Sequence, residues 1–301
     1  MRGNSNFVGI NFPRDIEKAI LALPVLDLLM LDLPTRNLLL KVYHPRLKRI
    51  LSVNPFLRIL PNKKSFPRPI KVVDLSKAMD RRGYRKKVGG LWKQALLSIR
   101  GVVRQEAIDY FLSGPFPRNC IWLEPEEYEY ISLISELTNG RYILLCIDVK
   151  RMDSYWSIYR WIDLVHRIVS QGDLFVLISS NDDGTVAETI SNLYRSRSLS
   201  ISYRSHLRYL LALMSKARVV LGSDLEQAFL GAYLRDGTIG LVSRSIYMRD
   251  FELWEEGNFV IHEKISPSSL AREVYSLVEK MEAKLTREER ELWSQPWNSV
   301  G

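Results

Sequence analysis

The stretch from His206 to Val242, HLRYLLALMSKARVVLGSDLEQAFLGAYLRDGTIGLV, constrains the fold more than any other part of the chain. Apolar residues at helical spacing predict a helix from about Leu207, and the short apolar run 217–222 has the length and β-branched content of a buried strand. A second helix over residues 226–234 precedes the turn Asp236-Gly237 and a second strand. Strand, tight loop and helix in this repeated order form the unit of a parallel α/β sheet.

The loop Gly222-Ser223-Asp224 is the first candidate ligand site. In a parallel α/β sheet such a loop opens at the carboxyl edge, where the free amides and the dipole of the next helix favour an anion such as phosphate. The alternative is an ordinary turn in which Asp224 serves only as the N-cap. The local sequence is compatible with both.

Composition limits the class of protein. With 301 residues and 46% apolar residues, the chain is expected to be a soluble globular protein of two ordinary domains or one large one. Cys120 and Cys146 lie in apolar runs, which predicts buried, reduced thiols and a cytoplasmic location. The four scattered histidines have no metal-ligand spacing, so neither a metal nor another bound cofactor is expected. The longest apolar run, 19–30, is interrupted by Pro24 and Asp27 and is too short to span a bilayer.

Charge is distributed unevenly along the chain. The first 120 residues hold 23 of the 43 Lys and Arg residues but only 8 of the 34 Asp and Glu residues, so the net charge of +9 arises there. The densest basic segment contains Arg81, Arg82, Arg85, Lys86 and Lys87. It is either a solvated surface or a binding surface for an anionic partner: nucleic acid, a phosphorylated glycan or an acidic membrane face, where the protein would be peripheral.

Strand and helix patterns alternate in both halves of the chain. Strands are expected at 7–11, 37–43, 57–60, 70–74, 119–123, 142–148, 174–179, 200–203 and 259–262, and helices at 16–29, 44–51, 156–171, 185–194 and 266–285. The turn Asn139-Gly140 marks the expected boundary between a basic domain, 1–138, and a second domain, 139–301. Two successive alternations predict an α/β protein with two Rossmann-like domains and mainly parallel sheets.

Several segments, in order, resemble glycosyltransferases of the GT-B fold, and in particular the heptosyltransferase-like group that acts on bacterial surface glycans. IEKAILALPVL is similar to the LGD and LPAL pattern of the family, RLKRILSVNPFLRIL and IKVVDL to the segments that follow, and GSDLEQAFLGAYL to its GNDSGPMHLAAAL segment. YILLCIDVKRMD and LFVLISSNDD are similar to strands of its second domain. The resemblance spans most of residues 5–245. It implies a GT-B fold with a cleft between two domains, and a glycosyltransferase that uses a nucleotide-sugar as co-substrate.

The chain departs from the family at the motifs that carry its chemistry. Glu17-Lys18 stand where the family has Gly-Asp, whose Asp is the presumed base. Residues 146–148, Cys-Ile-Asp, replace His-Pro-Gly. Of the DSGPMH motif only the first residue remains, as Asp224, and Glu226 places a negative charge close to the expected phosphate.

An inverting sugar transfer needs a base for the acceptor proton and positive groups or amides for the departing diphosphate. Asp15 and Glu17 are the nearest carboxylates to the usual position of the base. Asp15 can equally be only the N-cap of the first helix, and Glu17 only a solvent-facing charge. Lys18, together with the five basic residues of the segment 81–87, is expected to bind the acceptor.

The donor is expected at the carboxyl edge of the second sheet, because ligands of open α/β sheets lie outside the carboxyl ends of the strands. The candidate donor ligands directly follow three predicted strands: Lys150, Arg151, Ser179, Ser180, Asn181 and Asp224. The two basic residues would neutralise the diphosphate. The alternatives are exposed loop charges for the basic residues and polar turns for the others. Trp156 and Trp161 are expected in the core.

Three functions remain open. The first is transfer of a sugar from a nucleotide-sugar to an anionic acceptor, either a phosphorylated glycan or a surface polysaccharide. The second is sugar transfer onto bases in DNA, which a basic acceptor domain would suit. The third is a degenerate GT-B domain that only binds or scaffolds, as the motif losses favour. Donor turnover separates the third from the others, and salt-dependent nucleic-acid binding identifies the second.

Overall fold

The computed structural model describes residues 7–33, 37–66, 71–80, 99, 102–113, 118, 120–151, 156–182, 184–202, 207–242, 258–262 and 264–284. Contacts between Cα atoms divide the chain into two compact units. The first unit comprises Met1–Trp122 with Tyr247–Glu255, and the second comprises Leu123–Ile246 with Glu256–Gly301.

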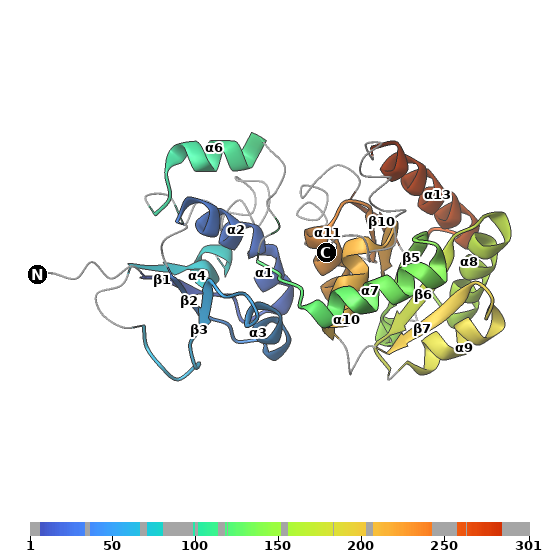
Figure 1. Cartoon of the computed structure of the whole chain (residues 1–301), viewed down its shortest axis with the longest axis horizontal. Helices are drawn as coiled ribbons and strands as arrows, with labels where there is room; N and C mark the ends of the chain where they lie inside the picture. Colours follow the sequence, from blue (N-terminus) through green and yellow to red (C-terminus); the bar gives the residue numbers. More distant parts are fainter. Residues whose placement is uncertain are drawn as a thin grey trace, which may run out of the picture. The chain divides into compact units, whose positions relative to one another are not determined.

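The first unit is built on a four-stranded parallel sheet (Figure 1). Its strands are β1 (Phe7–Asn11), β2 (Asn37–Lys41), β3 (Leu57–Ile59) and β4 (Lys71–Asp74), in the order β3-β2-β1-β4. Its helices are α1 (Ile16–Leu21), α2 (Leu23–Asp32), α3 (Pro45–Leu51), α4 (Leu75–Asp80) and α6 (Gln105–Ser113). The chain therefore runs from β1 through β2 to β3 in one direction and returns to place β4 on the other side of β1.

The second unit has a six-stranded parallel sheet in the order β10-β9-β8-β5-β6-β7. Its strands are β5 (Tyr142–Ile147), β6 (Phe175–Ser180), β7 (Ser198–Ser202), β8 (Val219–Gly222), β9 (Thr238–Val242) and β10 (Phe259–His262). Its helices are α7 (Pro125–Thr138), α8 (Ile158–Gln171), α9 (Thr185–Leu193), α10 (Leu207–Lys216), α11 (Leu225–Leu234) and α13 (Pro267–Lys284), with a 3₁₀ turn, η1 (Val149–Arg151).

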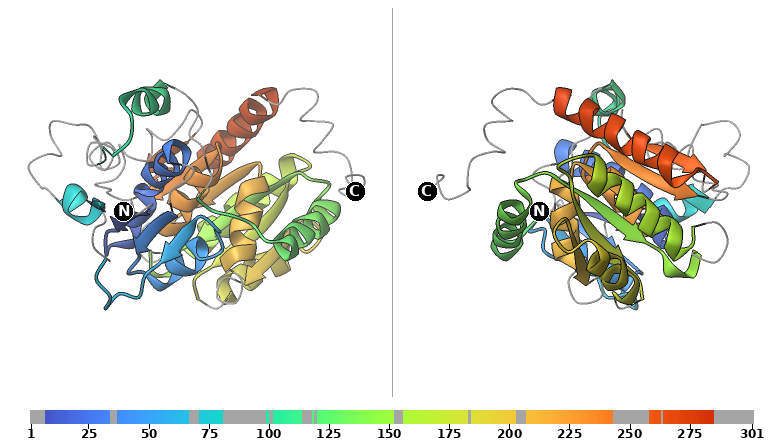
Figure 2. Two further views of the ribbon diagram at one scale, coloured as in Figure 1. Left: turned by 60° about the vertical axis from the view of Figure 1, so that its left-hand side comes forward. Right: turned by 90° about the vertical axis from the view of Figure 1, so that its right-hand side faces the viewer.

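The two faces of the second sheet bury different side chains. Ile143, Leu145 and Ile147 of β5 point to one face and pack with Trp161 of α8 and Leu270 of α13. Figure 2 shows α8 and α13 lying along this face. Because successive strand residues alternate between faces, Tyr142 points to the opposite face, where its hydroxyl donates to the Leu213 carbonyl of α10 (2.9 Å). A strand buried on both faces explains the continuous apolar run of β5.

Helix α7 packs with the second unit. Tyr130 of α7 and Tyr209 of α10 have ring centroids 4.7 Å apart, and Glu127 accepts from Arg208 Nη2 at 2.8 Å. Glu127 also accepts from the Glu124 amide (2.6 Å), which completes a capping box at the start of the helix. The division between the units therefore falls before α7, whereas the sequence boundary was expected after it, at Asn139-Gly140.

Two expected elements differ in the structure. The helix expected over residues 16–29 is broken at Ala22, because Pro24 lies in the first turn of α2, where its missing N–H is tolerated. The strand expected over 119–123 is wrong for residues 120–123, which form a loop. There the Cys120 amide donates to Asp27 Oδ1 (2.8 Å) and its carbonyl accepts from Asn54 Nδ2 (3.2 Å). Side chains thus satisfy the backbone that a neighbouring strand would have paired.

None of the helices in the described part of the chain combines the length and apolar character that crossing a bilayer requires.

Candidate functional site

The carboxyl ends of β1 and β4 form the switch point of the first sheet, where the strand order reverses. The register pairs Asn11 with Lys41 on one side and with Asp74 on the other. Open α/β sheets bind ligands in the crevice outside such a point.

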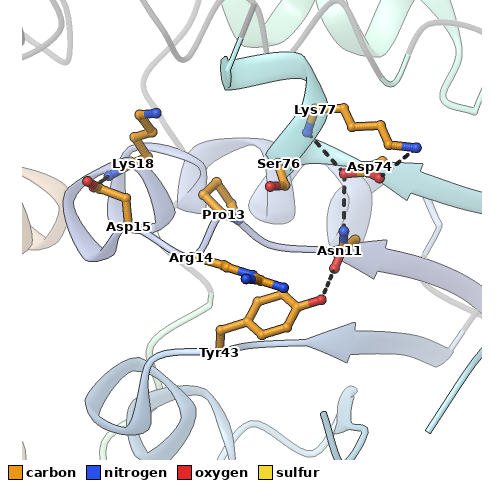
Figure 3. A pocket seen from close by; sticks show the side chains of 9 residues that line it. All are labelled: Asn11, Pro13, Arg14, Asp15, Lys18, Tyr43, Asp74, Ser76 and Lys77. Atoms are coloured by element: carbon orange, nitrogen blue, oxygen red, sulfur yellow. Dashed lines mark hydrogen bonds and ion pairs between the residues drawn. The ribbon is translucent and has the colours of Figure 1, made fainter. Parts of the chain in front are cut away.

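A pocket of about 480 Å³ lies at this switch point. Its described lining residues come from the ends of β1 and β4, from the segment after β2 and from the starts of α1 and α4: Asn11, Pro13, Arg14, Asp15, Lys18, Tyr43, Asp74, Ser76 and Lys77. Figure 3 shows their side chains directed around this space. The volume is in the range of small-molecule sites.

A chain of hydrogen bonds crosses the floor of the pocket (Figure 3). The Tyr43 hydroxyl donates to Asn11 Oδ1 (2.9 Å), and Asn11 Nδ2 donates to Asp74 Oδ1 (3.1 Å). Tyr43 and Asp74 together fix which way the Asn11 amide points, since one partner accepts and the other donates. The guanidinium of Arg14 lies over the Tyr43 ring, with its carbon 5.3 Å from the ring centroid.

Two Asp-x-x-Lys sequences start the helices on either side of the pocket. Asp15 Oδ1 accepts from the Lys18 amide, and Asp74 Oδ1 accepts from the Lys77 amide, each at 3.0 Å. The Lys77 ammonium also lies 3.6 Å from Asp74 Oδ2. The pocket thus combines two carboxylates with three cations, the third being Arg14. Such a site can accept a proton and bind an anion at the same time.

The acceptor-side residues named from the sequence fall in different places. Asp15 caps α1 and also lines the pocket, so its two expected roles are compatible, and Lys18 lines the same pocket. Glu17 is half-buried and is not among the described lining residues. Arg81, Arg82, Arg85, Lys86 and Lys87 lie outside the described residues.

The carboxyl edge of the second sheet is held together by its own hydrogen bonds. The strand order reverses between β5 and β8, and the loops after β5, β6 and β8 meet there. Asn181 Nδ2 donates to Asp148 Oδ1 (2.8 Å), and Asn181 Oδ1 accepts from the Val149 amide (2.9 Å). The Asp148 amide donates to Ser223 Oγ (2.9 Å), and the Lys150 amide to Asp148 Oδ1 (3.1 Å). Three successive amides therefore already have acceptors within the chain.

Side chains of the chain itself accept from amides in the first turns of two helices that begin at this edge, α11 and α9. Asp224 Oδ1 accepts from the Gln227 amide (3.3 Å) and Asp224 Oδ2 from Gln227 Nε2 (3.0 Å), so Asp224 is the N-cap of α11. At α9, Asp182 accepts from the Val186 amide (3.1 Å) and Ser180 Oγ from the Ala187 amide (3.2 Å). Amides and dipoles that favour an anion at a helix start here face carboxylates of the chain itself.

The other residues expected to bind the donor differ in their exposure. Lys150 is exposed, whereas the side chain of Arg151 lies outside what the structure describes. Ser179 is fully buried, and its hydroxyl has no hydrogen-bond partner among the described residues. Trp156 and Trp161 are buried, as expected for core residues.

Cys146, at the end of β5, is also buried. Burial raises the pKa of its thiol well above the usual range, and the charge of Asp224 adds to the effect, so the thiol stays protonated. Among the described residues, no group of three or more His, Cys, Asp or Glu side chains is arranged to hold a metal ion.

Sequence reasoning missed Asn11, Arg14, Tyr43, Asp74 and Lys77. A signal for two of them was available, because Asn11 and Asp74 end predicted strands, which is the criterion that selected residues on the second sheet. The repeated Asp-x-x-Lys spacing was a further signal. Nothing local identifies Tyr43, whose hydroxyl meets Asn11 across 32 positions of sequence.

Comparisons with known proteins bear on the fold. No protein-family model matches the chain, and no curated protein matches it in sequence. Its structure is similar to that of E. coli ADP-heptose LPS heptosyltransferase II, with 12% identity and a TM-score of 0.59 over 91% of this chain and 99% of that one. It is also similar to that of E. coli heptosyltransferase WaaC with ADP, with 13% identity and a TM-score of 0.58 over 91% of this chain and 99% of that one.

A glycosyl transferase family 9 protein from Veillonella parvula DSM 2008 is also similar, with 10% identity and a TM-score of 0.60 over 93% of this chain and 99% of that one. These likenesses, with the two all-parallel sheets, confirm the predicted α/β GT-B fold.

Proposed function

We propose that this protein is a glycosyltransferase that moves a sugar from a nucleotide-sugar to an anionic acceptor, such as a phosphorylated glycan. The observation that carries the proposal is the pocket of the first sheet, which brings Asp15 together with Arg14, Lys18 and Lys77. The excess of Lys and Arg in the first 120 residues further supports an anionic acceptor. The GT-B fold, together with the ADP-heptose and the ADP named with two similar structures, supports a nucleotide-sugar as donor.

Asp15 is the proposed base. One of its oxygens accepts from the Lys18 amide, and the other has no hydrogen-bond partner among the described residues. In the transfer, the acceptor hydroxyl gives its proton to Asp15 while its oxygen bonds to the anomeric carbon of the donor. The bond from that carbon to the diphosphate breaks, and the diphosphate leaves with the electron pair. Lys18 and Lys77 would hold the acceptor by its negative charge.

The donor is proposed to bind at the carboxyl edge of the second sheet. Lys150 is exposed there and would meet the diphosphate, with Asn181 and Asp224 shaping the edge beneath it. Arg151, Ser179 and Ser180 complete the proposed set. The amides of this edge are capped internally and Glu226 adds a negative charge, so the side chain of Lys150 would be the main contact for the diphosphate.

A thermal-shift panel of ADP-, UDP-, GDP- and CMP-sugars tests the donor first. A ligand that binds only the folded state must stabilise it, by about 2.7 kcal/mol at 100 times its Kd. Release of nucleotide is then measured with glucose 6-phosphate as acceptor probe. Stabilisation without any turnover would favour a non-catalytic GT-B-like binding protein, and neither stabilisation nor turnover would refute the proposal.

The base is tested with a matched pair of variants on the same helix. Asp15→Asn should lower the transfer rate by about 10²- to 10⁴-fold, while the asparagine still caps α1. Glu17→Gln removes a carboxylate that is not among the described lining residues, and it should leave the rate within about twofold. Equal rates for wild type and Asp15→Asn would rule out Asp15 as the base.

A further inference from the structure

We infer that Arg14 recognises the anionic group of the acceptor, and that Tyr43, Asn11 and Asp74 hold it in position for this. The inference deepens the proposed acceptor site and rests on that proposal for its biological meaning. It commits to the chemistry that Arg14 would bind: a phosphate or carboxylate group carried on a sugar.

Arg14 differs from Arg104 and Arg141 in having no ion pair among the described residues. It is exposed in the pocket, and no carboxylate of the described residues forms an ion pair with it. By contrast, Arg104 is paired with Asp32 (Nε–Oδ1 2.7 Å), and Arg141 bridges to Glu282 (Nη2–Oε1 3.1 Å). The Arg14 guanidinium therefore keeps its five N–H donors available to a ligand.

The ring of Tyr43 contacts this guanidinium. Its central carbon lies 5.3 Å from the centroid of the Tyr43 ring, within the range of a cation–π contact. Figure 3 shows it above the ring. The guanidinium carries a planar fork of N–H donors that can bind two oxygens of one anion, and the ring contact uses none of these donors in a hydrogen bond.

The Tyr43 ring is itself held by a chain of hydrogen bonds. The Tyr43 hydroxyl donates to Asn11 Oδ1 (2.9 Å), and Asn11 Nδ2 donates to Asp74 Oδ1 (3.1 Å). Asp74 is fixed in turn by the Lys77 amide (3.0 Å). These hydrogen bonds therefore link the end of β4, through the end of β1, to the ring that contacts Arg14.

The charges around Arg14 favour an anion at that place. Lys18 and Lys77 line the same pocket, whereas Asp15 and Asp74 lie on opposite sides of it (Figure 3). Asp74 is already met by the Lys77 ammonium (3.6 Å). Of the described lining residues, Arg14 therefore combines charge, planarity and unused donors best.

Binding of sugar probes without any donor tests the inference. Isothermal titration would measure glucose 6-phosphate and glucuronate, with glucose as the neutral comparison. Arg14→Gln should weaken binding of the preferred anion by about 10- to 100-fold, as expected for lost hydrogen bonds to a charged group. Arg14→Lys keeps the charge but loses the fork, and a loss of about tenfold is expected. The tighter of the two anions identifies the acceptor chemistry.

Two further variants separate recognition from general charge. Arg49→Gln removes an exposed arginine of α3 that is not among the described lining residues, and it should leave anion binding unchanged. Tyr43→Phe keeps the ring but frees it from Asn11, and about a threefold loss is expected for one hydrogen bond. Thermal melting of each variant checks that it is folded.

The outcomes distinguish this inference from the proposed function. Anion binding that depends on Arg14, in a protein that turns over no donor, would support the inference and refute the transfer reaction. Donor turnover with anion binding that is equal in wild type and Arg14→Gln would overturn the inference alone. Binding of neither anion to the wild-type protein would overturn it as well.

Discussion

The two sheets end in switch points of the same topology but of opposite character. At the first, side chains from β1, β4 and the segment after β2 surround an open pocket with three cations and two carboxylates. At the second, Asp148, Asn181 and Ser223 bond to one another and to the loop amides. The same strand order therefore yields one edge prepared for a ligand and one occupied by the chain's own groups. Fold places the edge, and the side chains decide what it can hold.

The largest effect should come from removing the residue that closes the second edge. Asn181→Ala deprives the Val149 amide and the Asp148 carboxylate of partners, and the free energy of unfolding should fall by about 2–4 kcal/mol. The matched change, Asn11→Ala, should cost only about 1 kcal/mol, because its partners border the pocket where water replaces it. Urea unfolding measures both. Equal losses would mean that the two edges are equally closed.

Two glycines, one in each unit, test whether the neighbouring atoms can make room for an added Cβ. A Cβ at Gly222 would lie 3.1 Å from Ala228 Cβ and 3.2 Å from the Asp224 carbonyl oxygen, so Gly222→Ala should cost about 1–3 kcal/mol of stability. A Cβ at Gly9 meets the Phe66 ring at 2.8 Å, but Phe66 is only half-buried and can rotate. Gly9→Ala should therefore cost less than about 1 kcal/mol. The denaturation midpoints of the two variants give the comparison, and a larger shift for Gly9→Ala would contradict it.

The negative charge of the second edge can be reduced directly. Glu226→Gln should tighten binding of the donor nucleotide by about fivefold, which corresponds to roughly 1 kcal/mol of repulsion in a solvated site. Titration of ADP and UDP into both forms measures this. Unchanged binding would mean that the glutamate points away from the ligand. If neither form binds a nucleotide, the proposed donor site is absent.

The smallest effect concerns pH at the first unit. Burial lowers the pKa of His44 below 6.5, and the charge of Arg46 lowers it further. A lowered pKa means that the folded state binds a proton less well than the unfolded chain. The stability from this group is thus present above pH 6.5 and is lost as the pH falls through the lowered pKa. His44→Gln should flatten the dependence of melting temperature on pH in that window, and an unchanged slope would exclude His44 as its source.

Much of the fold could be predicted because its signals are local. The strands at Phe7–Asn11 and Phe259–His262 have the bounds expected from their apolar runs. The strand expected over residues 119–123 is wrong at residues 120–123 for a tertiary reason. Cys120 is buried, but its backbone bonds to the side chains of Asp27 and Asn54 rather than to a neighbouring strand. Burial and strand formation give the same sequence signal but have different partners.

The site could be predicted only in part. The strand-end rule selected Asn181 and Asp224 but could not reveal that both are engaged by neighbouring groups of the chain. Asp15 and Glu17 lie two positions apart at the start of α1. Asp15 lines the pocket, whereas Glu17 is not among the described lining residues, and the direction of each side chain makes this difference. The position of Arg14 depends on Tyr43, which comes from another strand connection. Such outcomes depend on distant contacts, which no local pattern encodes.

The capped amides of the second edge also affect how fast a ligand can bind there. An amide exchanges its hydrogen with solvent only when its bond opens, and bonds that share the groups of Asp148 and Asn181 must open together. Exposed side chains such as Lys77 change rotamer within nanoseconds. A ligand arriving at the first edge therefore finds groups that adapt during the encounter. At the second edge a ligand that binds the capped amides must wait for a rare opening, so association through these amides should be slow even where the final complex is stable.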